Sequence, residues 1–266
     1  MAETNLPAGP LLAYYGDDFT GSTDVMEAFT AAGVPTVLFL RTPGPEWVQR
    51  FAHMRCIGLA GTARGHTPAW MREQLPAAFA SLQAFGAPLL HYKVCSTFDS
   101  STERGSIGQA IDLGVPHMGG RWSPMVVGAP RLRRYQAFGH LFAAMGDAVH
   151  RLDRHPTMSR HPVTPMGESD LRQHLAQQTP RRIGLIDLVT LKAGQGDAAL
   201  AALLADDVPV VMLDVVDEDT LAEAGRLVWE HRGDGLFSAS SSGLEYALAA
   251  HWRRSGALPA PAALPP

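Results

Sequence analysis

Three acidic and three hydroxyl side chains lie within eight residues near the start of the chain, in Asp17-Asp18-Phe19-Thr20-Gly21-Ser22-Thr23-Asp24. The adjacent carboxylates of Asp17 and Asp18 repel each other unless a cation, a hydroxyl or another donor lies between them. A helix cap at Thr20 or Ser22 accounts for one or two of these residues and leaves the paired aspartates unexplained. The residue types therefore favour a site for a small polar ligand.

Two further loops carry cations and hydroxyls, in Gly61-Thr62-Ala63-Arg64 and in the segment from Lys93 to Thr102. A lysine that ends an apolar strand must reach solvent or meet an anion, whereas Arg64 alone could form a surface ion pair of little worth. A serine-rich turn that includes Ser240 could bind an anion or only cap the next helix. This turn lacks the form of a P-loop.

These loops need elements that bring them together. Apolar segments predict strands, at 11–15, 36–40, 55–60, 89–94, 125–128, 182–188, 209–216 and 235–239. Between them lie predicted helices, at 22–32, 68–85, 106–113, 168–178, 196–205, 219–231 and 242–253. The alternation predicts an α/β fold with an open, mostly parallel sheet and helices on both faces. In such sheets ligands bind at the carboxyl ends of the strands, where all these loops fall.

Composition excludes several function classes. The 266 residues with 46% apolar content are enough for a sizeable core, in one large or two modest domains. The net charge of -4 and the lack of a dense Lys/Arg stripe predict no nucleic-acid and no membrane partner. Two cysteines, Cys56 and Cys95, without Cys-x-x-Cys spacing predict no metal site and fit the reducing cytoplasm. A lone Cys95 is more often a small buried residue than a nucleophile.

Two segments depart from the alternating pattern. Residues 114–165 are rich in Gly, Pro, Arg and His, and are expected to form a long excursion of the kind that serves as a lid or binding segment. Seven of the nine residues at 258–266 are proline or alanine, which is typical of a stiff linker.

The order of these motifs resembles the four-carbon acid sugar kinase family (DUF1537), over nearly the whole chain. The resemblance rests on Asp17-Asp18-Phe19-Thr20-Gly21, Thr62-x-Arg64, Tyr92-Lys93-x-x-Ser96-Thr97, Gly139-His140 and the serine-rich turn before Tyr246. It matches only that family's N-terminal sugar-binding domain. It implies a substrate domain at 10–253 and a linker at 254–266 toward an absent C-terminal nucleotide-binding domain.

The resemblance also implies roles. Members transfer the γ-phosphate of ATP, with Mg²⁺, to a hydroxyl of a sugar acid such as a threonate, erythronate or 3-oxo-tetronate. Asp18 and Asp17 are then the catalytic residues that act on the hydroxyl, with Asp18 preferred. The implied substrate-binding residues are Thr20, Arg64, Lys93, Ser96, Thr97, Asp99 and Ser240. ATP and Mg²⁺ would bind mainly to the absent domain, so this chain alone is expected to be inactive.

One departure from the family pattern concerns the substrate. The family commonly has an aspartate before Ser-Thr, where this chain has Cys95, and Asp99 is a candidate replacement. This change puts the particular sugar acid in question.

Two alternatives stay open. A non-catalytic module could bind a small carboxylic acid in the same crevice, although paired aspartates suit a hydroxyl better than an anion. A metal-dependent phosphatase would need a third carboxylate that the sequence does not identify. The expected partners are a small sugar acid and either a second copy of the chain or a separate nucleotide-binding domain.

Overall fold

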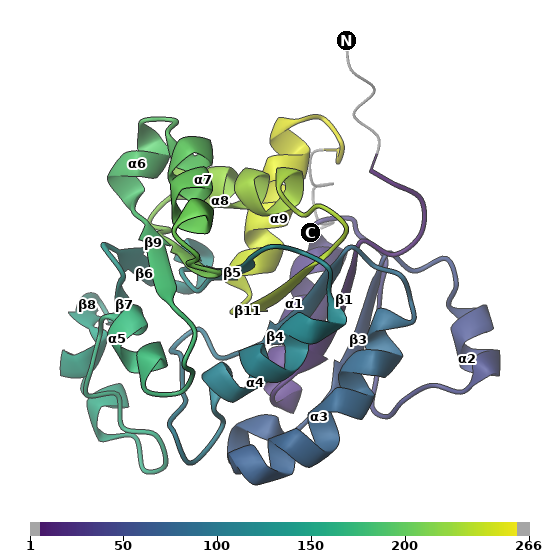
Figure 1. Ribbon diagram of the computed structural model, residues 1–266, viewed down its shortest axis with the longest axis horizontal. Coiled ribbons are helices and arrows are strands. Elements are labelled where there is room, and N and C mark those ends of the chain that lie inside the picture. Colours follow the sequence, from purple (N-terminus) through teal and green to yellow (C-terminus); the bar gives the residue numbers. More distant parts are fainter. Residues whose placement is uncertain (1–5, 260–266) are drawn as a thin grey trace.

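The computed structural model describes residues 6–259, and a five-stranded parallel sheet forms its centre (Figure 1). The strand order is β11-β4-β1-β3-β2, and every pairing is parallel. The strands are β1 (Leu12–Gly16), β2 (Thr36–Phe39), β3 (Cys56–Ala60), β4 (Leu89–Lys93) and β11 (Leu236–Ser240). Because β1 lies between β4 and β3, the loop after Gly16 emerges beside the loops that follow Ala60 and Lys93.

A second parallel sheet has the order β5-β10-β9, with β5 (Ser123–Val126), β9 (Ile183–Ile186) and β10 (Val210–Leu213). Between β5 and β11, serine hydroxyls form hydrogen bonds to the backbone of the facing segment in place of a continuous backbone ladder. The contacts are Ser123 Oγ to Phe237 O, Ser238 Oγ to Pro124 O and Val126 N to Ser240 Oγ, each 2.8 Å, and Ser241 Oγ to Val127 O at 2.7 Å. We call these four serines the serine seam.

Partner residues in the serine seam increase in number together along both strands, so β5 and β11 run in the same direction. The carboxyl ends of the two sheets therefore lie along one edge. This arrangement confirms the predicted open, mostly parallel α/β sheet.

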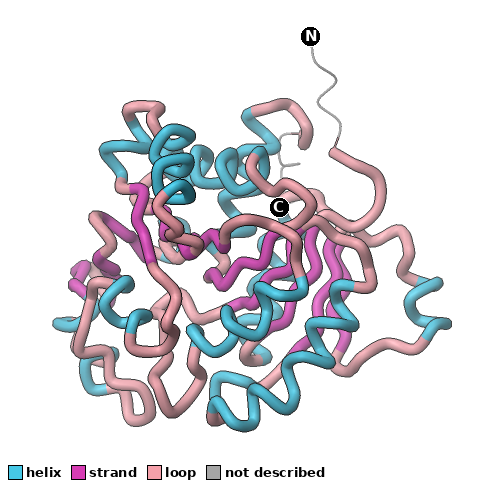
Figure 2. The backbone as a smooth tube through the Cα atoms, in the orientation of Figure 1, coloured by secondary structure: helices cyan, strands magenta, loops and turns pink. Residues whose placement is uncertain are grey.

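Helices cover both faces of the five-stranded sheet (Figure 2). Side chains of β1 alternate between two apolar clusters, because successive residues of a strand point to opposite faces. Ala13 and Tyr15 pack with α3 (Pro68–Gln83) and α4 (Ile107–Gly114). Leu12 and Tyr14 pack with α1 (Phe19–Ala31), α8 (Glu218–Glu230) and α9 (Gly243–Arg254). The remaining helices are α2 (Pro45–Arg50), α5 (Leu171–Ala176), α6 (Leu188–Lys192) and α7 (Gly196–Ala205).

The excursion predicted at 114–165 is more ordered than expected. It contains β5 and a small antiparallel sheet, β6 (Arg134–Ala137), β7 (His140–Met145) and β8 (Ala148–Arg151). Phe138 and Gly139 form the first turn with φ of 52° and 82°. A phenylalanine rarely adopts positive φ, so the sequence carries no hairpin signal of the Asn-Gly kind. The short helices α2 and α6 were also not predicted.

The start of the predicted linker packs against the body of the protein. The backbone N–H of Leu258 donates to Trp252 O at 3.0 Å, and Ala257 and Leu258 pack on the core beside α9. Residues 260–266 lie outside the described residues. The division of the chain at residue 253 stays a prediction.

Candidate functional site

Arg64 joins the two adjacent aspartates that follow β1. Its Nε and Nη2 donate to Asp17 Oδ2 and Oδ1 at 3.1 and 2.6 Å, and its Nη1 donates to Asp18 Oδ2 at 2.5 Å. Arg64 comes from the short turn after β3, whose backbone is fixed by a hydrogen bond of 3.0 Å from Arg64 N to Asp17 O. The guanidinium is therefore the cation that allows two neighbouring carboxylates to stand side by side.

The two aspartates differ in burial and therefore in what they can do. Asp17 is 1% exposed and both its oxygens face Arg64, whereas the Asp18 side chain is 30% exposed. Burial raises the pKa of Asp17, and Arg64 and then Lys93 oppose that rise. Burial also opposes the charge of Arg64, but Asp17 and Asp18 outweigh it and raise the pKa of the guanidinium. Arg64 therefore stays charged, and Asp18 is the carboxylate of the pair that a ligand can reach.

Asp18 also begins α1. Its Oδ1 accepts from Gly21 N at 2.6 Å, so Asp18, and neither Thr20 nor Ser22, is the N-cap. The helix accordingly starts at Phe19, three residues before the predicted start. A Cβ added to Gly21 would lie 2.8 Å from Asp18 Oδ1 and 3.1 Å from Lys93 Nζ, so only glycine fits between the carboxylate and the lysine without a shift.

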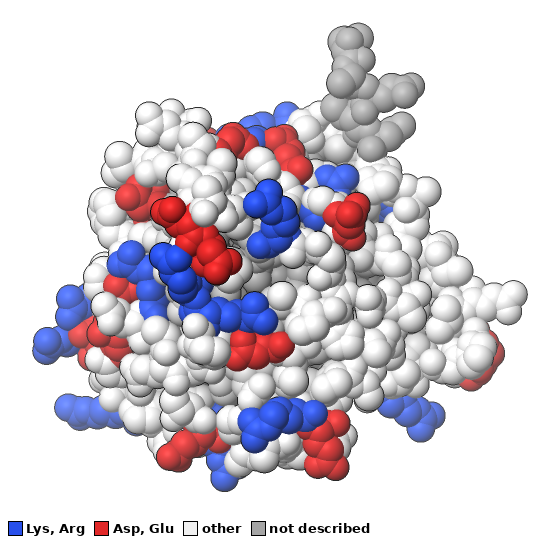
Figure 3. Space-filling view, in the orientation of Figure 1, with Lys and Arg blue, Asp and Glu red and all other residues white. Residues whose placement is uncertain are grey.

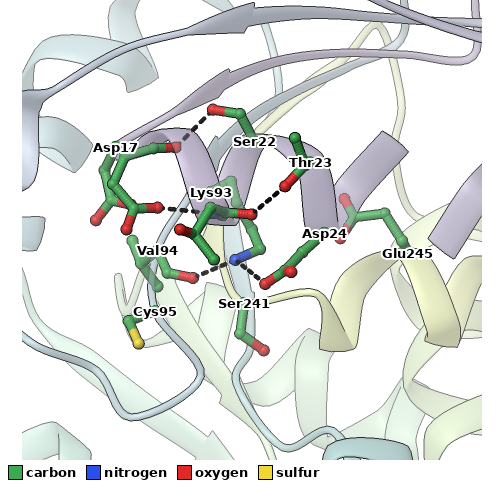
Figure 4. A network of polar contacts seen from close by, with 12 residues as sticks. Asp17, Ser22, Thr23, Asp24, Lys93, Val94, Cys95, Ser241 and Glu245 are labelled. Atoms are coloured by element: carbon green, nitrogen blue, oxygen red, sulfur yellow. Dashed lines mark hydrogen bonds and ion pairs between the residues drawn. The ribbon is translucent and has the colours of Figure 1, made fainter. Parts of the chain in front are cut away.

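Lys93 lies beneath the start of α1 and is 1% exposed. Figure 4 shows its ammonium between the carbonyl oxygen of Val94, to which it donates at 2.8 Å, and Asp24 Oδ2, which is 3.7 Å away. The expectation that an apolar strand ending in lysine leads to an anion is thus met by Asp24 within the chain. Lys93 and Arg64 nevertheless converge on the same point, since a Cβ added to Gly21 would lie within 4 Å of both side chains.

The loop after β4 carries a short chain of hydrogen bonds. Thr97 Oγ1 donates to Asp99 Oδ1 at 2.7 Å, so the thiol of Cys95, 3.0 Å from Thr97 Oγ1, must be the donor in that contact. Burial, and then Asp99, raise the pKa of the Cys95 thiol, which disfavours a nucleophilic role. The positive charge of Arg64 opposes this rise in the pKa of Cys95, so the loop lies beside the arginine that holds the aspartate pair.

The remaining predicted site residues lie in different surroundings. Thr20 is exposed in the first turn of α1, and Ser96 is half-buried. Ser240 is fully buried, and its hydroxyl contacts Val126 N and Ser238 Oγ in the serine seam. The structure thus brings together Asp17, Asp18, Arg64 and Lys93, with Cys95 to Asp99 next to them, and turns Ser240 away into the joint between the sheets. Their roles in ligand binding stay predictions.

Sequence patterns did not indicate that Ser100, His174 and Gln178 interact and thereby fix the loop after β4. Ser100 contacts His174 and Gln178, which are 74 and 78 residues further along the chain. Such a contact leaves no local spacing to detect.

Two properties of the described part bear on other function classes. Within residues 6–259 no helix is both long and apolar enough to cross a membrane, and no group of three His, Cys, Asp or Glu side chains is placed to hold a metal ion. On the face seen in Figure 3, cationic and anionic side chains lie next to one another, with no broad area of one sign.

In parallel α/β sheets, the carboxyl ends of the strands are where small polar ligands commonly bind, and here that edge carries a carboxylate pair, an arginine and a lysine. The family model described as "Sugar-binding N-terminal domain" matches residues 12–248. The chain belongs to this family, which confirms the resemblance to the four-carbon acid sugar kinases.

Two curated relatives are kinases of oxo acids. The chain is 66% identical over 262 residues to the 3-oxo-isoapionate kinase of Paraburkholderia graminis, which covers 98% of this chain and 56% of that protein. It is 33% identical over 218 residues to the 3-oxo-tetronate kinase of Burkholderia multivorans, which covers 81% of this chain and 49% of that protein. The chain thus spans about half the length of these relatives.

Solved structures share the fold. A Haemophilus influenzae protein of the DUF1537 family superimposes with a TM-score of 0.79 at 25% identity, over 92% of this chain and 56% of that one. A Bordetella bronchiseptica member, a domain-swapped dimer with bound citrate, gives a TM-score of 0.70 at 25% identity, over 91% of this chain and 57% of that one.

Proposed function

We propose that this chain is the substrate-binding part of an ATP-dependent kinase that phosphorylates a hydroxyl of a 3-oxo sugar acid. Within the class of threonates, erythronates and 3-oxo-tetronates and their branched analogues, identity of 66% to a 3-oxo-isoapionate kinase favours the branched 3-oxo acid. The observation that carries the proposal is the partly exposed Asp18 at the carboxyl edge of the sheet. Arg64 and the first turn of α1 hold its carboxylate in place.

The geometry suits a hydroxyl that is to be phosphorylated. Phosphoryl transfer needs a nucleophile in line with the γ-phosphate more than it needs covalent chemistry from the protein. Asp18 is fixed at both oxygens, by Gly21 N and by Arg64 Nη1, so it can accept the hydroxyl proton of a substrate in one orientation. Asp17 keeps Arg64 in place from the buried side.

The substrate carboxylate needs a cation. A guanidinium has five N–H groups, and the aspartates take three from Arg64, so two are left for a ligand. The ammonium of Lys93 adds positive charge from below. Ser96 and Thr97 on the neighbouring loop are the proposed hydroxyl contacts.

Magnesium does not fit the residues of this part of the protein. Asp17 and Asp18 are already paired with Arg64, and no third carboxylate joins them in the described residues. We therefore propose that ATP and Mg²⁺ bind to a nucleotide-binding half, for which the additional length of the relatives leaves room. A second copy of the chain is a proposed partner, since one solved relative is a domain-swapped dimer.

Calorimetric titration of the 266-residue chain tests the proposal. We expect 3-oxo-isoapionate or a 3-oxo-tetronate to bind, ATP with Mg²⁺ to bind weakly or not at all, and no ATP-dependent turnover. Binding of citrate and other carboxylic acids with no preference for the sugar acids would instead favour a non-catalytic carboxylic-acid module, as the citrate in one relative suggests. Turnover by this chain alone would contradict the assignment of ATP to another half.

The substitution Asp18→Asn tests the role of the carboxylate in the complete kinase. Asparagine caps helices as well as aspartate does, so the fold should be kept. We expect kcat to fall by roughly 10²- to 10⁴-fold, the range for a positioned proton acceptor. Glu27→Gln, at an exposed carboxylate on the same helix, is the matched control and should leave kcat nearly unchanged. Unchanged turnover in the Asp18→Asn enzyme would refute the assigned role.

A further inference from the structure

A strained residue lies in the middle of the loop that follows β4. Phe98 has φ of 59° and is fully buried, between Thr97 and Asp99. A bulky L residue in this left-handed region is unfavourable and persists only where its surroundings enforce it. The surroundings that enforce it come from residues far along the chain.

Ser100, two residues after Phe98, connects this loop to those distant residues. Its Oγ lies 3.0 Å from Phe98 O, 3.0 Å from Gln178 Nε2 and 3.0 Å from His174 Nε2. A carbonyl oxygen can only accept, so the hydroxyl proton of Ser100 points at Phe98 O. Both nitrogens must then donate to the two lone pairs of the serine oxygen.

Gln178 is oriented from its other end. Its Oε1 accepts from the backbone N–H groups of Ile107 and Gly108, at 2.8 and 3.3 Å, in the first turn of α4. The amide nitrogen therefore faces Ser100 without ambiguity.

His174 completes the arrangement. Its Nε2 carries a proton, because it donates to Ser100, and burial lowers the pKa of this histidine, which favours the neutral form of the ring. The ring also packs edge-on against Phe98, with centroids 5.8 Å apart. One residue of α5 thus contacts both the side chain of Phe98 and the serine that fixes its carbonyl.

We propose that Ser100, His174 and Gln178 are positioning residues that hold the loop 95–101 in the conformation that binds substrate. They set the backbone from which Thr97 and Asp99 form their hydrogen-bonded chain with Cys95, the residue of this loop that lies near Arg64. This inference rests on the proposed function for the identity of the ligand, and on the contacts above for the network itself.

The substitution Gln178→Glu separates positioning from folding. A carboxylate at 178 still accepts from Ile107 and Gly108, and a helix start favours its charge, so α4 keeps its cap. It can no longer donate to Ser100, and it attracts the serine proton away from Phe98 O. Gln177→Glu is the matched control, since Gln177 is exposed and, among residues 6–259, its side-chain amide has a hydrogen bond only to Gln173 O.

Two measurements on the 266-residue chain decide the matter. For Gln178→Glu we expect amide hydrogen exchange at 96–101 to accelerate roughly tenfold. Affinity for 3-oxo-isoapionate or 3-oxo-tetronate should fall about tenfold, with the melting temperature little changed. His174→Gln should retain more affinity than His174→Leu, because glutamine keeps a donor near the position of Nε2.

The outcomes are distinct. Unchanged exchange at 96–101 in Gln178→Glu would overturn the network. Accelerated exchange with unchanged affinity would make it a structural feature only and overturn the positioning role. No sugar-acid binding by the unaltered chain would overturn the proposed function, and the positioning role with it, whatever the exchange shows.

Discussion

Two arginines in this protein each hold several carboxylates, in opposite surroundings. Arg64 binds Asp17 and Asp18 at the carboxyl edge of the sheet, and Asp17 is 1% exposed. Arg226 on α8 binds Asp197, Glu223 and Glu230, of which Asp197 and Glu230 are about half exposed. Distances are alike, near 2.6 Å in both clusters. The main difference is access to water, because water can solvate a carboxylate that has lost its partner only at the surface.

That difference separates a site from a surface clamp. Charges that water cannot reach must be matched by the protein, so the Arg64 cluster fixes two loops and one helix start in a single geometry. The Arg226 cluster links α7 and α8 through side chains that solvent screens. A ligand hydroxyl that meets Asp18 therefore meets an oriented group, which is the property that catalysis needs.

Replacing each arginine by methionine should give the largest contrast. Arg64→Met removes the partner of a buried carboxylate, and we expect the free energy of unfolding at pH 7 to fall by about 3 kcal/mol or more. Arg226→Met should cost less than about 1 kcal/mol. Urea unfolding of both variants measures the difference.

A second substitution added to Arg64→Met identifies the cause of its loss of unfolding free energy. If the unpaired charge of Asp17 is responsible, Arg64→Met combined with Asp17→Asn should recover a substantial part of the loss. Equal destabilisation by the two methionine substitutions would mean that burial does not distinguish the clusters.

Neutral side chains extend the comparison. Ser240→Ala leaves the buried N–H of Val126 without an acceptor, so we expect a loss of about 1–2 kcal/mol in stability and no change in affinity for the sugar acid. Ser96 is half-buried and its hydroxyl has no hydrogen bond to any residue in 6–259, so Ser96→Ala should leave stability nearly unchanged and weaken binding several-fold. Weakened binding by a fully stable Ser240→Ala protein would restore Ser240 to the ligand site.

The sequence predicted the α/β class and the parallel strands, because these strands are apolar runs that alternate with helical segments. It did not predict the antiparallel strands β6 to β8, which lack such a pattern. It was sufficient to gather Asp17, Asp18, Arg64 and Lys93, because the carboxyl ends of neighbouring parallel strands must meet. It could not predict that Ser240 faces a second sheet, because a serine in a ligand-binding turn and a serine in the serine seam have the same local sequence pattern. It also could not find Ser100 with His174 and Gln178, because that contact depends on packing between segments more than 70 residues apart.

The smallest effect is expected at Asp197. Hydrogen bonds from Arg226 and then His231 lower the pKa of this carboxyl to about 2, although burial opposes the shift. An unfolded aspartate titrates near 3.9, so the unfolded chain binds the proton first as pH falls. The stabilising contribution is therefore complete above about pH 4 and is lost as pH falls toward 2.

Asp197→Asn should accordingly flatten the dependence of unfolding free energy on pH between 4 and 2, by less than about 1 kcal/mol because half of the side chain is exposed. Added salt should shrink the difference between variant and wild type at pH 5. The Arg64 cluster should keep most of its contribution in the same salt, since ions do not reach Asp17. If added salt changes the loss of unfolding free energy equally in Arg64→Met and Asp197→Asn, the two clusters share one environment. That result would contradict the difference in burial between them.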